Sequence, residues 1–269
     1  MENMDFLWMN LRSLPYFRAI LRAMESKAYQ QFSLQRPILD LGCGDGHFAK
    51  MTFKDGLDVG IDPWKGPVYK AKNANGHKTI VLGSGECLPF PPQYFNTIIS
   101  NSVLEHIPEI DVVLAELSRV SRKDTIFIFC VPNHNFLSNL SISNFLDRIS
   151  MNKLADGYRA FFNRISRHYH CDPPEIWRER LESHGFRIEK WWHYFSPEAF
   201  RVLEWGHYLG LPSLVSHYLF NKWILVPEKW NLWLIERALR PYYEEYPDQV
   251  NGSYTFYVAR RVDKEKSPI

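Results

Sequence analysis

The chain has 269 residues, of which 45% are hydrophobic, and a formal net charge of +2 from 32 basic and 30 acidic side chains. This length suits one elaborated α/β domain, or one domain with a cap. A balanced charge without a basic run argues against a nucleic-acid partner. The four cysteines have no CxxC spacing, which favours a reduced protein, and we expect it in the cytoplasm.

Two stretches of the sequence decide whether a signal peptide or a membrane-spanning helix is expected. The N-terminal stretch has an acid at position 2 and no long apolar core, which is untypical of a signal peptide. The longest uncharged stretch, 205–221, contains Pro212 and is short for a spanning helix. We therefore expect no spanning segment, while peripheral contact with a membrane surface stays open.

The first predicted element is a helix within residues 10–30, where apolar side chains recur at helical spacing and Pro15 marks a start. Short apolar runs follow, and stretches such as 110–121 with helical spacing separate most of them. These runs are typical of buried parallel strands and lie at 38–41, 58–62, 79–82, 97–100 and 126–131. Strand and helix in alternation predict βαβ units and a parallel sheet.

The pattern changes after Pro132. Residues 133–170 are polar with some helical spacing, which indicates an insertion. A helix is expected to begin with Asp172 as its cap and to end at Gly185. Strand-like runs at 186–195 and 254–262 flank 199–247, which is aromatic and partly helical.

The strongest local pattern is Asp40-Leu41-Gly42-Cys43-Gly44-Asp45-Gly46, between a predicted strand and a predicted helix. Its glycines allow a tight turn and let a ligand approach the main chain. The following helix N-terminus offers free N–H groups to an anion. A dinucleotide fingerprint would need a further glycine at position 47, where His stands.

Three further patterns follow the next strands. Asp62 ends the second strand, where a carboxylate can accept both hydroxyls of a ribose. The third strand is followed by Gly83-Ser84-Gly85-Glu86-Cys87-Leu88-Pro89-Phe90, and the fourth leads into Ser100-Asn101-Ser102-Val103-Leu104-Glu105-His106-Ile107.

Together these segments resemble, in the same order, the cofactor-binding layout of class I S-adenosylmethionine-dependent methyltransferases of the small-molecule type. Ser84 and Gly85 replace the family's usual Asp and Ala beside the adenine. Residues 121–124, Ser-Arg-Lys-Asp, stand where the family has Lys-Pro-Gly-Gly. The resemblance covers about 38–107 and does not extend to 133–170 or 200–250.

The resemblance implies a Rossmann-like, seven-stranded, mostly parallel sheet with helices on both faces, plus an aromatic-rich helical cap. The expected organisation is an N-terminal helical segment (1–32), a cofactor-binding core (33–135), an insertion or lid (136–170), a core continuation (171–198), the cap (199–250), and a last strand and tail (251–269).

The implied cofactor is S-adenosylmethionine. The expected cofactor-binding residues are Asp40, Gly42, Cys43, Gly44, Gly46, Asp62, Pro63, Ser84, Gly85, Glu86, Asn101 and Ser102. His106 and His134 are candidate general bases for a hydroxyl acceptor, and Tyr169 and His170 are candidate substrate contacts. The implied reaction is in-line methyl displacement onto a small, apolar or aromatic acceptor, held beneath a lid formed by 133–170 and 199–247.

No metal is expected. The run from His168 to Asp172 contains several ligand types, but adjacent residues in an extended loop point apart and no second cluster follows it. We interpret this run as a loop lining the acceptor pocket.

The aromatic C-terminal region has three interpretations: the core of a helical cap, an acceptor pocket, or a membrane-facing patch with Lys222 and Lys229. The function also has alternatives. One is a catalytically inactive S-adenosylmethionine-binding protein, and another is a nicotinamide-dependent oxidoreductase. A nucleic-acid methyltransferase is disfavoured, because Ser100-Asn101-Ser102-Val103 stands where amino-methylating members carry Asn/Asp-Pro-Pro-Tyr/Phe.

Overall fold

The structure is a computed structural model that describes residues 4–262. The chain divides into two compact units. We call the first the helical unit; it contains the described residues up to Gln31, Asn135–Ser166 and His193–Ser253. The second, the sheet unit, contains Phe32–His134, Arg167–Trp192 and the described residues from Tyr254 onward.

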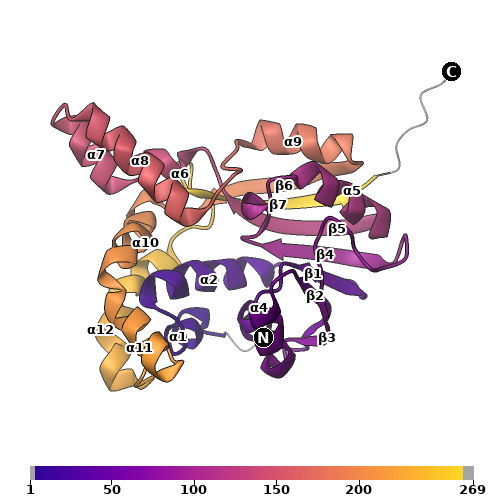
Figure 1. Cartoon of the computed structure of the whole chain (residues 1–269), viewed down its shortest axis with the longest axis horizontal. Coiled ribbons are helices and arrows are strands. Elements are labelled where there is room, and N and C mark those ends of the chain that lie inside the picture. Colours follow the sequence, from indigo (N-terminus) through magenta and orange to yellow (C-terminus); the bar gives the residue numbers. More distant parts are fainter. Residues whose placement is uncertain (1–3, 263–269) are drawn as a thin grey trace. The chain divides into compact units, whose positions relative to one another are not determined.

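A seven-stranded sheet with the order β3-β2-β1-β4-β5-β7-β6 organises the sheet unit (Figure 1). Its strands are β1 Ile38–Leu41, β2 Leu57–Asp62, β3 His77–Leu82, β4 Phe95–Asn101, β5 Ser121–Pro132, β6 Phe186–Tyr194 and β7 Tyr254–Arg261. Strands β1 to β5 pair in parallel, and β7 pairs with β5 antiparallel. The sheet is therefore mostly parallel, as expected, and residues 121–124 belong to the start of β5 instead of a turn.

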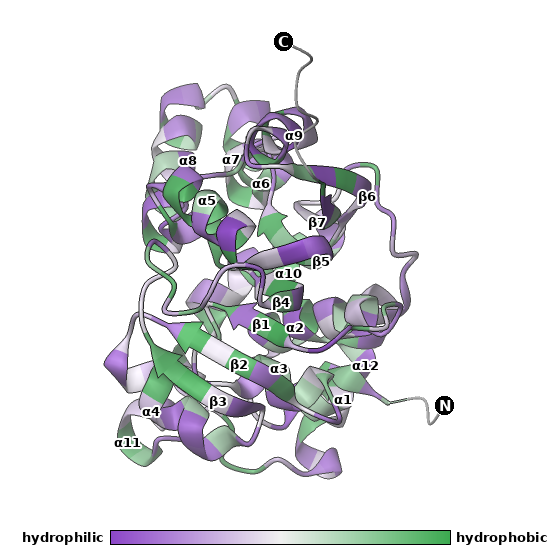
Figure 2. Ribbon diagram, turned by 90° about the vertical axis from the view of Figure 1, so that its right-hand side faces the viewer, coloured by the Kyte–Doolittle hydropathy of each residue, from purple (hydrophilic) through white to green (hydrophobic). Residues whose placement is uncertain are grey.

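Helices cover both faces of this sheet. They are α3 His47–Thr52, α4 Lys65–Ala74, α5 Ile110–Val120 and α9 Pro174–Ser183, with a short 3-10 turn at Leu104–His106. Helices α5 and α9 share one buried apolar cluster with β1, β4, β5 and β7, whereas α4 lies on the other side (Figure 1). Figure 2 shows the hydrophobic stretches along the strands that form this core.

The helical unit is built from amphipathic helices. They are α1 Phe6–Leu11, α2 Tyr16–Tyr29, α6 Asn135–Ser138, α7 Ser141–Arg148, α8 Asn152–Ser166, α10 Pro197–Leu209, α11 Leu211–Phe220 and α12 Lys229–Glu244. Helix α10 begins at Pro197 because the Ser196 side chain accepts the Ala199 N–H at 3.1 Å.

The helix predicted to start at Pro15 is confirmed as α2, which begins at Tyr16 with Pro15 at its N-cap position, and the short helix α1 ends before it. One local prediction differs from the structure. Asp172 does not cap α9. Its carboxylate instead accepts from Arg180 Nη1 at 2.5 Å, and Pro173 occupies the cap position.

The aromatic C-terminal region is not uniformly core. Phe200 and Leu203 of α10 are buried, but Trp205, Trp230 and Trp233 are 44%, 72% and 48% exposed. The interpretation of this region as the core of a cap is therefore wrong for these three tryptophans. Among residues 4–262, no helix is both long and apolar enough to cross a membrane.

Candidate functional site

The predicted site residues gather at one edge of the sheet. Because β1 to β4 run parallel, their carboxyl ends meet at the same edge. The last residues of these strands are Leu41, Asp62, Leu82 and Asn101. The loops that follow them therefore lie next to one another at this edge of the sheet unit.

The glycine loop has the backbone that its sequence predicts. Gly42, Gly44 and Gly46 have φ angles of +75°, +55° and +76°, in the left-handed region that favours glycine. A Cβ on Gly42 would lie 2.4 Å from a Val103 methyl carbon, so Gly42 is required for packing. A Cβ on Gly44 would meet no protein atom within 4 Å, so Gly44 borders open space.

Asp62 connects this loop to the end of β2. One carboxylate oxygen accepts the Gly44 N–H at 3.0 Å and the other accepts the Trp64 N–H at 2.9 Å, while the residue is only 7% exposed. A carboxylate oxygen has two lone pairs, so each oxygen can accept one more hydrogen bond. Asp62 can thus hold the loop and accept ribose hydroxyls together.

Asp40 and Cys43 lie behind the loop. The Asp40 carboxylate bonds to His77 Nε2 at 2.8 Å and both side chains are buried, which sequence reasoning did not anticipate. Burial raises the pKa of the Cys43 thiol well above its usual range, and the Asp40 carboxylate raises it further. Cys43 therefore stays a neutral thiol. Direct cofactor contacts of Asp40 and Cys43 stay predictions.

The segment after β3 is held at both ends. Gly83 N–H donates to the Asp62 carbonyl at 3.1 Å, and Glu86 N–H donates to Ser84 Oγ at 3.2 Å. Farther on, Glu116 of α5 accepts the Leu88 N–H at 2.7 Å. The side chains of Ser84 and Glu86 are exposed, so both are accessible to a ligand.

A second clamp on this segment comes from Arg119. Its guanidinium donates to the carbonyls of Leu88 and Phe90 at 2.9 and 2.8 Å and forms a bidentate pair with Glu116. The hydrogen bonds from Arg119 hold the pKa of the Glu116 carboxyl below its ordinary value of 4.5. Charge-assisted bonds therefore fix the segment that follows β3.

The end of β4 is tied to β5. The Cys130 thiol donates to Asn101 Oδ1 at 3.0 Å, and Ser102 N–H donates to the Cys130 carbonyl at 3.0 Å. Ser102 has a φ of +53°, which turns the chain away from the strand direction. Asn101 and Ser102 thus lie on a fixed backbone, and their cofactor contacts stay predictions.

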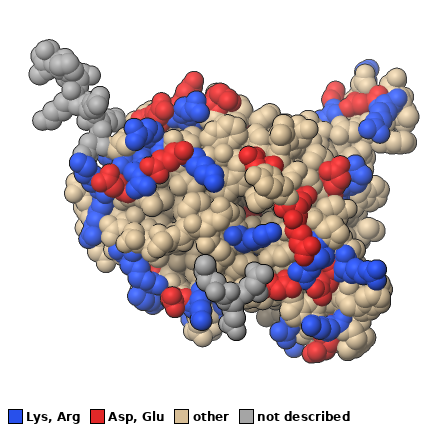
Figure 3. Space-filling view, turned by 180° about the vertical axis from the view of Figure 1, so that it is seen from behind, with Lys and Arg blue, Asp and Glu red and all other residues tan. Residues whose placement is uncertain are grey.

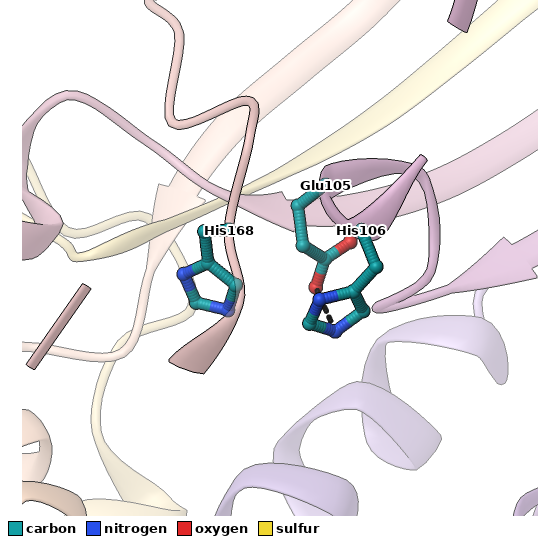
Figure 4. Close-up of side chains that lie close together, drawn as sticks. All are labelled: Glu105, His106 and His168. Atoms are coloured by element: carbon teal, nitrogen blue, oxygen red, sulfur yellow. Dashed lines mark ion pairs between the residues drawn. The ribbon is translucent and has the colours of Figure 1, made fainter. Parts of the chain in front are cut away.

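The segment 167–170 lies against the turn that contains Glu105 and His106. Tyr169 N–H donates to the Glu105 carbonyl at 2.7 Å, His106 Nδ1 donates to the Arg167 carbonyl at 3.0 Å, and His170 Nε2 donates to the Ile107 carbonyl at 2.9 Å. This arrangement brings Glu105, His106 and His168 together (Figure 4).

His168 and its neighbours differ in exposure. Burial, together with the nearby His106, lowers the pKa of His168 to about 3, so this imidazole is neutral near pH 7. The Tyr169 side chain is 63% exposed, and that of His170 is partly buried. His134 follows β5 and is exposed, and the structure does not bring it into the Glu105–His106–His168 cluster.

Trp64 is a candidate that sequence reasoning missed. It follows Asp62 and Pro63 and its side chain is 70% exposed. An exposed aromatic face two residues after the predicted ribose acceptor is suited to stack on a base. Its position two residues after Asp62 is the sequence feature that could have identified it.

Comparisons with known proteins agree with this layout. Residues 39–129 match the family model described as a methyltransferase domain. A methyltransferase without assigned substrate from Mycobacterium marinum is 33% identical over 90 residues, which are 32% of this chain and 35% of the relative. The malonyl-acyl carrier protein O-methyltransferase of Hamiltonella defensa is 31% identical over 97 residues, which are 34% and 36% of the two chains. The matched region thus spans about a third of the length of these curated relatives.

Solved structures show the same fold. A methyltransferase from Mesorhizobium loti that depends on S-adenosylmethionine matches with a TM-score of 0.54 and 14% identity, over 89% of this chain and 98% of that one. A Thermotoga maritima methyltransferase of the same kind matches with a TM-score of 0.53 and 12% identity, over 92% and 91% of the two chains.

Residues 39–129 of the chain thus match a methyltransferase domain, and the solved structures share its fold. The cofactor expected of such a domain is S-adenosylmethionine, and the residues at the sheet edge fit that group. The open space at Gly44 leaves room for a ligand beside the backbone, and the Asp62 carboxylate retains acceptor capacity beside it. In the methyltransferase domain, Gly44 and Asp62 are therefore the residues best placed to hold the cofactor.

Proposed function

We propose that this protein transfers the methyl group of S-adenosylmethionine to a small, apolar or aromatic acceptor by in-line displacement. The observation that carries the proposal is the Asp62 carboxylate bonded to Gly44 N–H at the open edge of the sheet. This arrangement gives a ribose acceptor and an unobstructed backbone in one place.

The bound cofactor supplies an activated methyl group on a positively charged sulfur. The residues of this chain then have three tasks. Asp62 orients the ribose, Trp64 offers an aromatic face to the adenine, and the segment 84–86, clamped through Leu88, closes the base-binding side. Positioning of this kind lowers the barrier without a covalent intermediate on the protein.

A hydroxyl acceptor must lose a proton during transfer. His106 is the stronger candidate base of the two predicted, because its Nδ1–H donates to the Arg167 carbonyl and its Nε2 therefore carries the lone pair. His134 stays a second candidate at the end of β5. Base catalysis of this type contributes about 10²–10⁴-fold.

One comparison bears on the acceptor atom. The name of the Hamiltonella defensa relative places a methyl group on an oxygen of an acyl substrate, which favours an oxygen acceptor.

A polymeric nucleic acid is disfavoured as the acceptor. On the face shown in Figure 3, Lys and Arg are interspersed with Asp and Glu. The net charge of +2 is also small. A nucleic-acid groove would instead need a surplus of basic side chains to offset the phosphates.

A membrane surface is the proposed partner of the helical unit. The stretch from the end of α10 through α11 to the start of α12 exposes a run of apolar side chains: Leu209, Leu211, Leu214, Val215, Tyr218, Leu219, Phe220, Leu225, Trp230, Trp233 and Leu234. The exposed cations Lys222 and Lys229 lie in the same stretch and complement anionic headgroups. Apolar and aromatic side chains beside lysines are typical of interfacial helices.

The partner proposal is tested by vesicle flotation. The chain is expected to float with vesicles containing anionic lipid, and Leu214→Glu/Leu219→Glu is expected not to. Flotation of the double variant at the wild-type level, or self-association of the wild type without lipid binding, would contradict the membrane assignment.

The catalytic proposal is tested by turnover. Purified protein is incubated with S-adenosylmethionine and panels of phenols, fatty acids, amines, and nucleic acids, and formation of the demethylated product is measured. Methylation of an apolar or aromatic member is expected. Methylation of nucleic acid alone would overturn the acceptor class, and tight cofactor binding without turnover on any panel would favour the inactive binding protein.

A further inference from the structure

Three side chains with metal-ligating atoms come together in the sheet unit, from two segments that are about sixty residues apart. Each of Glu105, His106 and His168 offers one ligand atom, and these atoms lie within 4.8 Å of one another. Figure 4 shows the His168 ring facing the Glu105 carboxylate and the His106 ring. The combination is two imidazoles and one carboxylate.

The spacing of these atoms is close to that of a metal site. Zinc ligands lie about 2.0–2.2 Å from the ion, so atoms around a tetrahedral ion are about 3.3 Å apart. His106 Nε2 is 3.8 Å from Glu105 Oε1. The ligand atoms therefore need to approach one another by about 0.5–1.5 Å, which side-chain rotation can supply.

The surrounding contacts orient the ligand atoms. A carbonyl can only accept, so the bond between His106 Nδ1 and the Arg167 carbonyl places the proton on Nδ1 and the lone pair on Nε2, toward Glu105. His168 Nδ1 contacts Cys171 Sγ at 3.6 Å, which leaves Nε2 as the ligating nitrogen. The Tyr169 N–H to Glu105 carbonyl bond holds the two backbones together at 2.7 Å.

The donor set selects the kind of ion. Imidazole nitrogen with one carboxylate suits zinc and similar transition ions, whereas Mg²⁺ prefers an all-oxygen octahedron. Three protein ligands leave one position of a tetrahedral ion open, as in catalytic zinc sites. We propose that Glu105, His106 and His168 bind one Zn²⁺ ion with an open coordination position.

The consequence for chemistry rests on the proposed function. A hydroxyl held at the open position would lose its proton to solvent more readily. Its oxygen would then form a bond to the methyl carbon as the carbon–sulfur bond breaks, and His106 would act as a ligand instead of a base. The products are a methyl ether, the demethylated cofactor and one proton.

The test measures metal binding directly. Chelator-treated full-length chain is titrated with Zn²⁺ by calorimetry, and bound zinc is counted after gel filtration. We expect one Zn²⁺ per wild-type chain, at least tenfold weaker binding to His168→Gln and Glu105→Gln, and no competition from Mg²⁺. His184→Gln is the matched control, because His184 lies outside the cluster and bonds to Arg180 and Ser183.

Several results would overturn the site. The first is a wild-type chain that binds less than one Zn²⁺ per chain. The second is a His168→Gln variant that binds Zn²⁺ as tightly as the wild type does. The third is a loss of Zn²⁺ affinity in His184→Gln equal to that in His168→Gln. Melting curves in chelator establish that each variant folds. If the variants unfold, the wild type is titrated with Co²⁺ and its absorption spectrum is measured instead. An intense spectrum of four-coordinate Co²⁺ is expected. A weak spectrum of six-coordinate Co²⁺ would contradict the proposal.

Affinity for the demethylated cofactor separates this inference from the proposed function. We expect the His168→Gln chain to retain it, because His168 is not among the residues that hold the cofactor. Loss of cofactor affinity in the chelator-treated wild type would show that the zinc ion supports the cofactor site, and would overturn the assignment to the acceptor.

Discussion

At the scale of single residues, Asp62 carries the most specific prediction. Its carboxylate bonds to Gly44 N–H and Trp64 N–H and retains acceptor capacity for a ribose. Hydrogen bonds to a charged acceptor contribute about 1.5–3 kcal/mol each, so Asp62→Ala is expected to weaken binding of the demethylated cofactor at least tenfold in calorimetry. Asp55→Ala is the control, since Asp55 is exposed and precedes β2 at its other end. An unchanged dissociation constant for Asp62→Ala would remove this residue from the site.

Gly44 provides the second residue-scale prediction. Its φ of +55° disfavours any residue with a Cβ, and the space that a Cβ would enter is open. We expect Gly44→Val to abolish cofactor binding while lowering unfolding stability by only about 1–3 kcal/mol. Gly66→Val is the comparison, because Gly66 is equally open but has no positive φ. Retained binding with a much lower melting temperature would make Gly44 a structural glycine only.

At the scale of elements, Glu204 stabilises the start of α7. This buried carboxylate of α10 accepts the N–H groups of Ser141 and Ile142 at 2.7 and 3.1 Å and the Tyr158 hydroxyl at 2.9 Å. It therefore satisfies N–H groups that a helix start leaves without intrahelical partners.

Removal of Glu204 leaves these partly buried donors without their acceptor. Glu204→Ala is expected to reduce the free energy of unfolding by about 1–3 kcal/mol in urea titrations, with faster amide exchange in α7. Glu198→Ala, an exposed acid in the first turn of the same helix, is expected to cost less than about 1 kcal/mol. Equal effects of the two substitutions would refute this capping role.

At the scale of the whole molecule, the pH dependence of stability tests the Glu116–Arg119 clamp. The pKa of Glu116 lies below 4.5 in the folded chain because of the hydrogen bonds from Arg119. A depressed carboxyl pKa contributes stability above its unfolded value, and this contribution is lost as the pH falls through the folded value.

Glu116→Gln is therefore expected to unfold more easily than the wild type near pH 7, by less than about 1 kcal/mol because the pair is partly solvated. The difference should shrink below pH 4.5. Asp111→Asn, an acid with 68% exposure on the same helix, is the control in the same denaturant series. A difference that grows toward low pH would contradict the clamp.

Local sequence patterns determined much of the fold. Apolar runs of four or five residues indicated β1 to β4, and in the central strands β1 and β4 they are buried on both faces. The three glycines of the loop after β1 have positive φ, as tight turns require. Asp62 could be predicted because its position follows from the length of one βαβ unit.

Long-range contacts decided the rest. The pairing of Asp40 with His77 follows from the register that places β3 beside β2, and the approach of His168 to Glu105 follows from hydrogen bonds between distant segments. Sequence reasoning expected no metal, because adjacent residues of His168–Asp172 point apart and no second cluster follows them. The structure places Glu105 and His106, from an earlier segment, beside His168.

The exposure of Trp205, Trp230 and Trp233 could not be read from their spacing either, because helical periodicity shows that one face is apolar but not what covers it. Thus the sequence by itself determined the strands, the glycine loop and the position of Asp62 at the end of β2, whose geometry is fixed by neighbouring residues. Only the tertiary structure decided which distant polar side chains meet, because strand register and hydrogen bonds between segments set those distances.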